Sequence, residues 1–168
     1  DSSRTGVERQ TGFRRAVNVT ATPGEGAMSE NTHSVYPGLK YRDARGAIDW
    51  LGQAFAAEVL TLVPGEGDRV EHAEVRIGDG IVMLGSAGDP GGSGVDWPAG
   101  AGCVYLVTSV ERVGAEFARA AAAPGAEVVR AVADTDYGSR DYIVRDPEGN
   151  LWCVGTYRPA FPAAASDA

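Results

Sequence analysis

Apolar residues recur along the chain with the alternating period of a strand in some segments and the spacing of a helix in others. These two kinds of segment follow one another in the same order twice. An alternating apolar and polar pattern over residues 34–42 predicts a strand. A helical spacing comes next, with apolar side chains at Ala47, Ile48, Leu51 and Phe55. Asp43 stands where a residue can cap the N-terminus of that helix. Three further strands are expected over residues 58–63, 69–77 and 81–86.

The second half of the chain repeats this order. A strand is predicted over residues 102–108, and Ser109 is expected to cap a helix with Val113, Phe117 and Ala121 on its apolar stripe. Pro124 and Gly125 should end that helix. Three strands follow, over residues 127–132, 140–145 and 151–157. Asp43 and Ser109 stand 66 residues apart, as do Leu51 and Phe117, and a period this long indicates a duplicated module.

A tight turn joins the last two strands of each half. The clearest example is Asp146-Pro147-Glu148-Gly149-Asn150, where Pro147 presets φ and Gly149 or Asn150 can take a positive φ. Gly78-Asp79-Gly80 is a weaker copy in the first half. We interpret Asp146, Pro147 and Gly149 as turn residues without a catalytic part. Trp50 and Trp152 are expected in the core.

These elements predict an α+β fold. Each half reads βαβββ, and two such modules are expected to form a curved, cup-shaped mixed sheet with the helices on its outer face. The predicted segments are an N-terminal arm (1–33), a first module (34–87), a Gly-rich linker (88–101), a second module (102–158) and a C-terminal tail (159–168). Within the arm, residues 13–20 could form an edge strand. Met28 lies where a natural chain could start, so residues 1–27 are either native or a non-native extension.

Charge and composition exclude several classes of protein. The 168 residues are 43% hydrophobic, which suffices for a sizeable core, and 15 basic against 23 acidic residues give a net charge of −8. That charge argues against binding to nucleic acid or to anionic membranes. No apolar run approaches a membrane span, and no apolar block of a signal peptide is seen at the N-terminus. Two cysteines make no disulfide framework, so we expect a cytoplasmic protein with reduced thiols.

Several motifs carry a resemblance to a known superfamily. They are Tyr41-Arg42-Asp43-Ala44, Ala47-Ile48-Asp49-Trp50-Leu51, His72-Ala73-Glu74-Val75-Arg76-Ile77-Gly78-Asp79-Gly80, Asp134-Thr135-Asp136-Tyr137-Gly138-Ser139-Arg140-Asp141 and Asp146-Pro147-Glu148-Gly149-Asn150. Together they resemble the vicinal oxygen chelate superfamily of glyoxalases, bleomycin resistance proteins and extradiol dioxygenases, and most closely its glyoxalase-like branch. The resemblance runs from about Val35 to Pro159.

The resemblance implies where a metal would bind. Metal-dependent members carry a ligand, usually His or Glu, on the first and last strand of each module, and the matching positions are Tyr36, Met83, Cys103 and Cys153. Fe²⁺, Mn²⁺ and Ni²⁺ prefer imidazole and carboxylate donors, so we expect no usual metal site and no cofactor. A divalent metal at an atypical site is the alternative. Cys103 and Cys153 could face one another and capture a soft ion or form a bond, or they could simply line an apolar cup.

Two polar residues of one strand are candidates for catalysis. In the strand 69–77, Ala73, Val75 and Ile77 should cover the helix, which places His72 and Glu74 on the opposite face, toward the cup. Two residues apart on one face, they could act as base and orienting group. The alternative is a structural role, in hydrogen bonds to neighbouring strands or to a partner subunit.

Trp97, Tyr137 and Arg140 are candidates for the mouth of the cup. Trp97 and Tyr137 lie in predicted loops, where their rings could stack on a planar or hydrophobic ligand or anchor a dimer. The Gly-rich segment 88–94 lacks the Lys-Ser/Thr ending of a phosphate-binding loop, so we do not expect the chain to bind a nucleotide there.

Two functions of different classes are therefore open. The first is a metal-free binding protein, similar to the bleomycin resistance type, that holds a small hydrophobic or aromatic molecule in the cup and forms a homodimer. The residues proposed to line its ligand site are Tyr36, Met83, Trp97, Cys103, Tyr137, Arg140 and Cys153. The second is a glyoxalase-like lyase, isomerase or dioxygenase with an atypical site, which either has an unusual metal ligand set or uses His72 and Glu74 for acid–base work. The departure from the usual ligand set favours binding.

Overall fold

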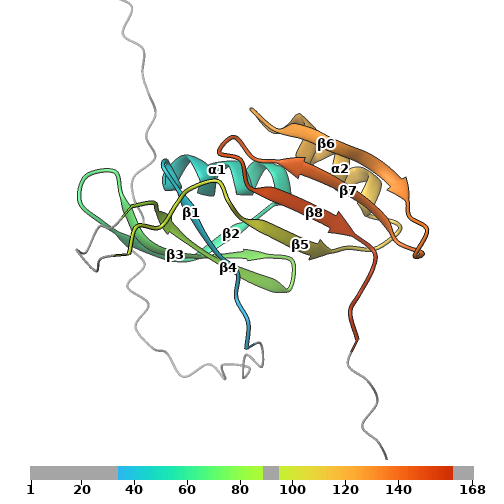
Figure 1. Ribbon diagram of the computed structural model, residues 1–168, viewed down its shortest axis with the longest axis horizontal. Helices are drawn as coiled ribbons and strands as arrows, with labels where there is room; N and C mark the ends of the chain where they lie inside the picture. Colours follow the sequence, from blue (N-terminus) through green and yellow to red (C-terminus); the bar gives the residue numbers. More distant parts are fainter. Residues whose placement is uncertain (1–33, 89–94, 161–168) are drawn as a thin grey trace, which may run out of the picture. The chain divides into compact units, whose positions relative to one another are not determined.

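The structure is a computed structural model that describes residues 34–88 and 95–160, and in that part the chain forms the βαβββ order twice (Figure 1). The first module consists of β1 (Gly38–Tyr41), α1 (Ala44–Phe55), β2 (Glu58–Pro64), β3 (Val70–Ile77) and β4 (Gly80–Ser86). The second consists of β5 (Cys103–Val107), α2 (Val113–Ala122), β6 (Glu127–Asp134), β7 (Arg140–Arg145) and β8 (Leu151–Gly155). The α+β class and the duplicated module are confirmed. The edge strand predicted over residues 13–20 lies outside the described residues.

Each module builds one four-stranded mixed sheet. The strand orders are β1-β4-β3-β2 and β5-β8-β7-β6, so the two sheets have the same topology. In each sheet the first strand runs parallel to the last, and the other neighbours are antiparallel. The registers also correspond, because Gly38 pairs with Met83 in the first sheet and Tyr105 pairs with Cys153 in the second.

Helix α1 begins and packs as its sequence predicts. Asp43 caps it, since the Asp43 side chain accepts a hydrogen bond of 2.9 Å from the backbone N–H of Gly46. Its buried face includes Ala47, Trp50 and Leu51. The helix ends at Ala56, which takes the left-handed conformation with φ 54°.

The predicted capping role of Ser109 is wrong. Helix α2 begins at Val113, with Arg112 in the N-cap position and no side-chain capping bond. The backbone carbonyl of Ser109, in place of its hydroxyl, accepts hydrogen bonds from the N–H groups of Arg112 and Val113, at 3.1 and 3.0 Å. The chain therefore makes a turn before the helix starts. At the other end, α2 stops at Ala122 and Gly125 has φ +74°, as the Pro-Gly pair predicts.

One face of each sheet is covered by a helix and the other is not. In β3, Ala73 and Val75 are fully buried beneath α1, and Trp50 and Trp152 are buried in the core as predicted. His72 and Glu74 lie on the opposite face, because side chains alternate along a strand. We call this uncovered face of each sheet its open face. The outer strands β2 and β6 are exposed along almost their whole length.

The two modules meet through their helices and at a close contact just before β5. Gly102, immediately before β5, lies directly against Leu39 of β1, and a Cβ atom at Gly102 would clash with Leu39 Cδ2. Helices α1 and α2 pack together, and Arg119 Nε donates a 3.0 Å hydrogen bond to the carbonyl of Ala54. Within the part of the chain that is described, neither helix has the length and apolarity needed to cross a membrane.

Candidate functional site

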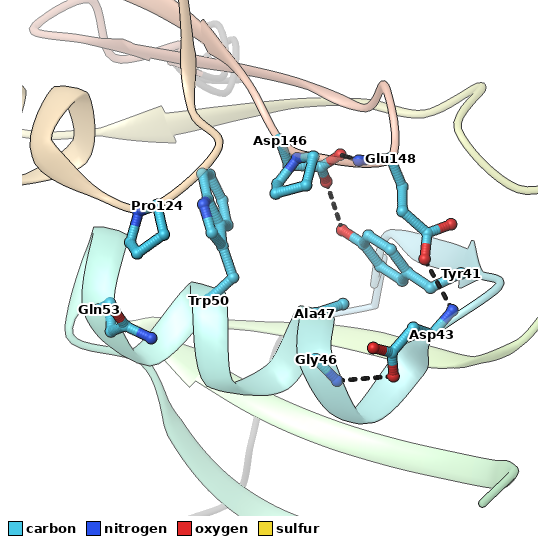
Figure 2. Close-up of a pocket in the computed structure, with 10 residues that line it drawn as sticks. Tyr41, Asp43, Gly46, Ala47, Trp50, Gln53, Pro124, Asp146 and Glu148 are labelled. Carbon is cyan, nitrogen blue, oxygen red and sulfur yellow. Dashed lines mark hydrogen bonds between the residues drawn. The ribbon is translucent and has the colours of Figure 1, made fainter.

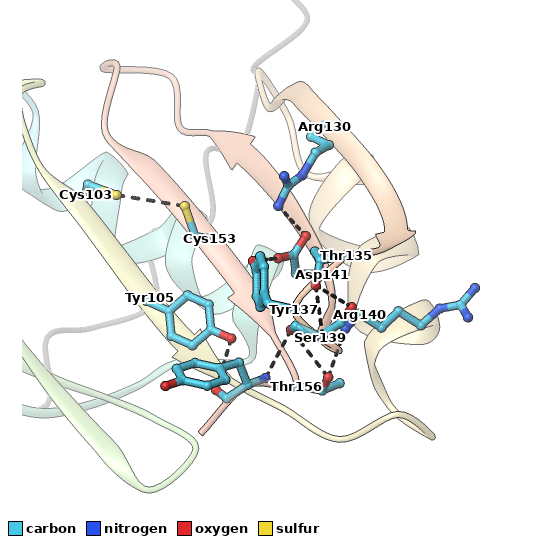
Figure 3. A network of polar contacts seen from close by, with 11 residues as sticks. Cys103, Tyr105, Arg130, Thr135, Tyr137, Ser139, Arg140, Asp141, Cys153 and Thr156 are labelled. Carbon is cyan, nitrogen blue, oxygen red and sulfur yellow. Dashed lines mark hydrogen bonds and ion pairs between the residues drawn. The ribbon is translucent and has the colours of Figure 1, made fainter. Parts of the chain in front are cut away.

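Two cysteines lie side by side on the open face of the second sheet (Figure 3). Cys103 opens β5 and Cys153 lies in the middle of β8, on neighbouring parallel strands. Their sulfur atoms are 3.9 Å apart, and both thiols are free. Burial and, to a smaller extent, the neighbouring Cys103 raise the pKa of the Cys153 thiol to about 11. The Cys153 sulfur is therefore protonated at neutral pH when no ligand binds it.

Three tyrosines stand beside the cysteines. The ring of Tyr105 shares the open face with Cys103, and its hydroxyl donates a 3.0 Å hydrogen bond to the backbone carbonyl of Tyr157. The rings of Tyr137 and Tyr157 meet edge to face at 6.3 Å between centroids. These side chains are 40% (Tyr105), 61% (Tyr137) and 52% (Tyr157) exposed, so a ligand can reach all three rings. Sequence reasoning identified Tyr137 and missed the other two.

A buried carboxylate holds Tyr137 in place. Asp141 of β7 is only 3% exposed, and it pairs with the guanidinium of Arg130 on β6. The Tyr137 hydroxyl donates a 2.9 Å hydrogen bond to Asp141, and this bond raises the pKa of Tyr137. Since a buried charge needs a partner, the Arg130–Asp141 pair fixes the position of the tyrosine hydroxyl.

The turn that carries Tyr137 is tied by hydroxyl groups. Thr135 Oγ1 accepts a hydrogen bond of 2.9 Å from the N–H of Ser139, and Ser139 Oγ accepts one of 3.1 Å from the N–H of Tyr157. Thr156 Oγ1 accepts a third from the N–H of Arg140 at 2.9 Å. The tyrosines of the open face are thus presented by a fixed backbone.

Arg140, predicted at the mouth of the cup, lies at the start of β7. Its guanidinium pairs with Asp134 at 3.2 Å and extends away from Tyr105 and Tyr137 in Figure 3. The structure therefore does not bring Arg140 together with Tyr137, although the two residues are close in sequence.

The open face of the first sheet carries His72 and Glu74. Nε2 of His72 is 3.4 Å from Oε1 of Glu74, and the two side chains are 39% and 34% exposed. Oε2 of Glu74 accepts a 3.0 Å hydrogen bond from the hydroxyl of Thr61 on β2. Glu74 also pairs directly with Met83 across the ladder between β3 and β4. His72 and Glu74 are thus adjacent, as predicted, and lie beside one of the four expected ligand positions.

The four positions implied by the resemblance are equivalent in the two modules. Tyr36 stands two residues before Gly38, the strand partner of Met83, and Cys103 stands two residues before Tyr105, the partner of Cys153. Their donors are a phenol, a thioether and two thiols, which suit Fe²⁺, Mn²⁺ or Ni²⁺ poorly. No group of three or more His, Cys, Asp or Glu side chains that could hold a metal ion occurs among residues 34–88 and 95–160. The residues present do not fit the usual metal.

Trp97 lies in the loop before the second module, as predicted, and is 52% exposed. The Nζ atom of Lys40, in β1, is 6.0 Å from the centroid of its ring. Trp97 is therefore placed near the first sheet, whereas Tyr137 belongs to the second.

A cavity of about 380 Å³ lies on the helix side of the molecule (Figure 2). Its walls come from α1 and from the turn after β7. The lining residues are Tyr41, Asp43, Gly46, Ala47, Trp50, Gln53, Pro124, Asp146, Pro147 and Glu148. The size is within the range of small-molecule sites. None of the residues predicted to bind a ligand lines it.

Asp146 is one of the residues that line this cavity. Its buried carboxylate accepts hydrogen bonds from Tyr41 Oη at 2.8 Å, Asn150 Nδ2 at 3.0 Å and Trp152 Nε1 at 3.2 Å. The backbone N–H groups of Glu148 and Asn150 also donate to it, at 3.0 and 2.9 Å. Burial raises the pKa of Tyr41, and the charge of Asp146 raises it further. Asp146 makes the turn as predicted, and in addition it binds the first module to the second, which sequence reasoning missed.

Glu148 binds the N-terminal end of α1 from the other module. Its two carboxylate oxygens accept hydrogen bonds of 2.7 Å each from the backbone N–H groups of Arg42 and Asp43. Negative charge at the N-terminus of a helix is favourable. The carboxylates of Asp43, Asp146 and Glu148 that line the cavity thus all accept hydrogen bonds from the protein itself. In contrast, the buried Nε1 of Trp50 has no hydrogen-bond partner among the described residues.

Comparison with known proteins agrees with this architecture. A family model described as the Glyoxalase/Bleomycin resistance protein/Dioxygenase superfamily matches residues 35–154. An uncharacterised protein of Mycobacterium tuberculosis is 36% identical over 152 residues, which cover 89% of this chain and 82% of that protein. An uncharacterised protein of Mycobacterium bovis is 38% identical over 122 residues, covering 71% of this chain and 80% of its own length.

Solved structures show the same fold. The crystal structure of TioX from Micromonospora sp. ML1 is 34% identical in sequence, with a TM-score of 0.58 over 74% of this chain and 100% of that one. Lactoylglutathione lyase from Agrobacterium tumefaciens is 18% identical, with a TM-score of 0.57 over 74% of this chain and 92% of that chain. The second likeness concerns the fold alone.

Proposed function

Because the chain belongs to the Glyoxalase/Bleomycin resistance protein/Dioxygenase superfamily, we propose that it binds a small hydrophobic or aromatic molecule on the open face of its sheets, without the usual divalent metal. The observation that carries this proposal is the group of exposed rings of Tyr105, Tyr137 and Tyr157 on the second sheet. Aromatic side chains supply large apolar contact area and stack on planar ligands. The Arg130–Asp141 pair orients one of the rings before a ligand arrives.

We further propose that a second copy of the chain completes the site. The outer strands leave large apolar side chains exposed to solvent, namely Val59, Leu60, Leu62 and Val63 on β2 and Val128 and Val129 on β6. Exposed apolar patches of this kind mark interaction surfaces. Two free thiols favour a cytoplasmic location, and a net charge of −8 argues against binding to nucleic acid or anionic membranes.

A thermal-shift screen against planar aromatic compounds tests the binding function. A ligand of the native state raises the melting temperature, and a hit should lose most of its shift in Tyr137→Ala and in Tyr105→Ala. The control is Trp50→Phe, which alters the cavity on the helix side and leaves the open face intact. A shift that survives both tyrosine changes and disappears in Trp50→Phe would place the ligand in the cavity instead and contradict the proposal.

The contact between His72 and Glu74 supports a second candidate, a lyase, isomerase or dioxygenase with an atypical site. At 3.4 Å, Glu74 can orient the His72 ring for proton transfer. His72→Gln and Glu74→Gln should then abolish a measured turnover, whereas Arg76→Gln, on the same strand, should not. One equivalent of Fe, Mn, Ni or Zn held through His72 or Glu74 in protein purified without chelator would favour this function over metal-free binding.

A further inference from the structure

Sulfur atoms occupy most of the positions at which a metal-dependent relative would present ligands. Cys103, Cys153 and Met83 hold three of the four positions, and Tyr36 holds the remaining one. Sulfur ligands select soft ions such as Cu⁺, while imidazole and carboxylate ligands select harder ones. The change of donors therefore changes the class of ion that these positions can hold.

The spacing of the two thiols suits one shared ion. A zinc–thiolate bond is usually about 2.3 Å long. If one ion makes two bonds of this length to sulfur atoms 3.9 Å apart, the bonds enclose an angle of about 116°. This angle is close to that of a trigonal centre. Bridging therefore needs little movement of either strand, and a third position is left free.

The strand partners named below for the two thiols are apolar, and the strands themselves are well supported. Cys103 pairs with Leu151 in the ladder, and Cys153 pairs with Ile143, so neither cysteine has a carboxylate as its direct strand neighbour. Asp141, the buried carboxylate nearby, is already paired with Arg130. Strand β8 lies between β5 and β7, which holds Cys153 in a fixed place. Cys103 is exposed, so an ion can reach the pair from the open face.

We propose that Cys103 and Cys153 supply two thiolates of a three-coordinate site for a soft monovalent cation of the class of Cu⁺ and Ag⁺, with the third position open to a ligand from solution. On binding, each thiol releases its proton to solvent and forms one sulfur–metal bond, and no oxidation state changes. Zn²⁺ requires four ligands, and the described residues bring no third His, Cys, Asp or Glu to this pair. The proposal is independent of the aromatic ligand, because it rests on the thiols alone.

Titration of the reduced, full-length protein with Ag⁺ under anaerobic conditions tests the site. Ag⁺ is the probe because it binds like Cu⁺ without redox chemistry. One ion per chain should bind, with a thiolate-to-metal charge-transfer band in the ultraviolet. A competing chelator should then give the affinity for Cu⁺, with Zn²⁺ bound at least 100-fold more weakly.

Single substitutions separate a shared site from two independent thiols. Cys103→Ser and Cys153→Ser should each lower the Cu⁺ affinity at least 100-fold, because one thiolate then remains. Cys103→Ser is the safer variant for folding, since Cys103 is exposed. Val110→Ser, at an exposed residue outside the helices and strands, is the control and should leave the affinity unchanged. Binding of two Ag⁺ ions per chain, or a Cu⁺ affinity that survives in the double serine variant, would overturn the proposal, and neither result bears on aromatic binding.

Discussion

A single carboxylate, that of Asp146, joins residues from both ends of the folded region. Tyr41 lies 105 positions before it in the sequence, and the tyrosine hydroxyl donates to it inside the core. A charged group in the interior is stable only when hydrogen bonds replace the water it has lost. The bond from Tyr41 to Asp146 is therefore a buried polar contact that holds the two modules together.

Two tyrosines allow this contact to be tested by the same chemical change. Tyr41→Phe removes one donor from the buried Asp146 carboxylate and should lower the free energy of unfolding by about 2 kcal/mol. Tyr142→Phe should instead raise it, by up to about 1 kcal/mol, because the buried Tyr142 hydroxyl has no partner among the described residues. Urea denaturation of both variants measures the difference. Equal destabilisation by the two changes would contradict the role assigned to Asp146.

At the scale of elements, helix α1 receives its N-terminal contacts from two modules. Asp43 caps it from its own module, and Glu148 accepts hydrogen bonds from Arg42 and Asp43 across the junction. The start of the helix is therefore sensitive to how the modules are docked. The turn that follows β7 acts both as a hairpin and as an interface.

Loss of the Glu148 carboxylate should weaken this junction. Glu148→Ala leaves two backbone N–H groups at the start of α1 without their acceptor, and we expect a loss of about 1–2 kcal/mol in the free energy of unfolding. Arg42→Ala is the matched control, because its side chain is 70% exposed and the ion pair to Glu148 spans 3.5 Å. An exposed pair of this kind contributes at most about 1 kcal/mol. The cross-module contact would be unimportant if chemical denaturation gave both variants the same midpoint.

The outer strands β2 and β6 also share an irregularity in their pairing with the neighbouring strand. Each ladder has two register shifts, and at the first of them the pairing passes over an apolar residue of the outer strand, Leu60 between Val59 and Thr61 on β2 and Val129 between Val128 and Arg130 on β6. Leu60 is 46% exposed and Val129 44%. A bulge of this kind bends a strand and interrupts its pairing. Both modules thus present an apolar side chain outward at equivalent places.

For the whole molecule, these apolar strands lead us to expect a homodimer. Sedimentation velocity at micromolar concentration should give a dimer, and Leu60→Asp or Val129→Asp should shift it toward the monomer by placing a charge in the interface. The control is Val110→Asp, at a residue that is 64% exposed and lies outside the strands. A native chain that sediments as a monomer would remove the shared site from the proposed function.

Much of the architecture could be predicted because the forces that set it are local. The periods of apolar residues and the Asp43 cap predicted the order of helices and strands, and the structure confirms that order. The alternation along β3 likewise predicted that His72 and Glu74 share one face. Ser109 shows where local reasoning fails, since a residue suited to capping stands four positions before the helix that it was expected to begin.

By itself, the sequence determined the duplicated βαβββ order and the atoms offered at the four ligand positions, because periodicity and residue identity are properties of neighbours along the chain. Only the tertiary structure decided which of those atoms meet. The 3.9 Å between Cys103 and Cys153, the pairing of Arg130 with Asp141 and the bond from Tyr41 to Asp146 depend on strand register, bulges and the docking of two modules. Such contacts join residues far apart in sequence, so no local pattern encodes them.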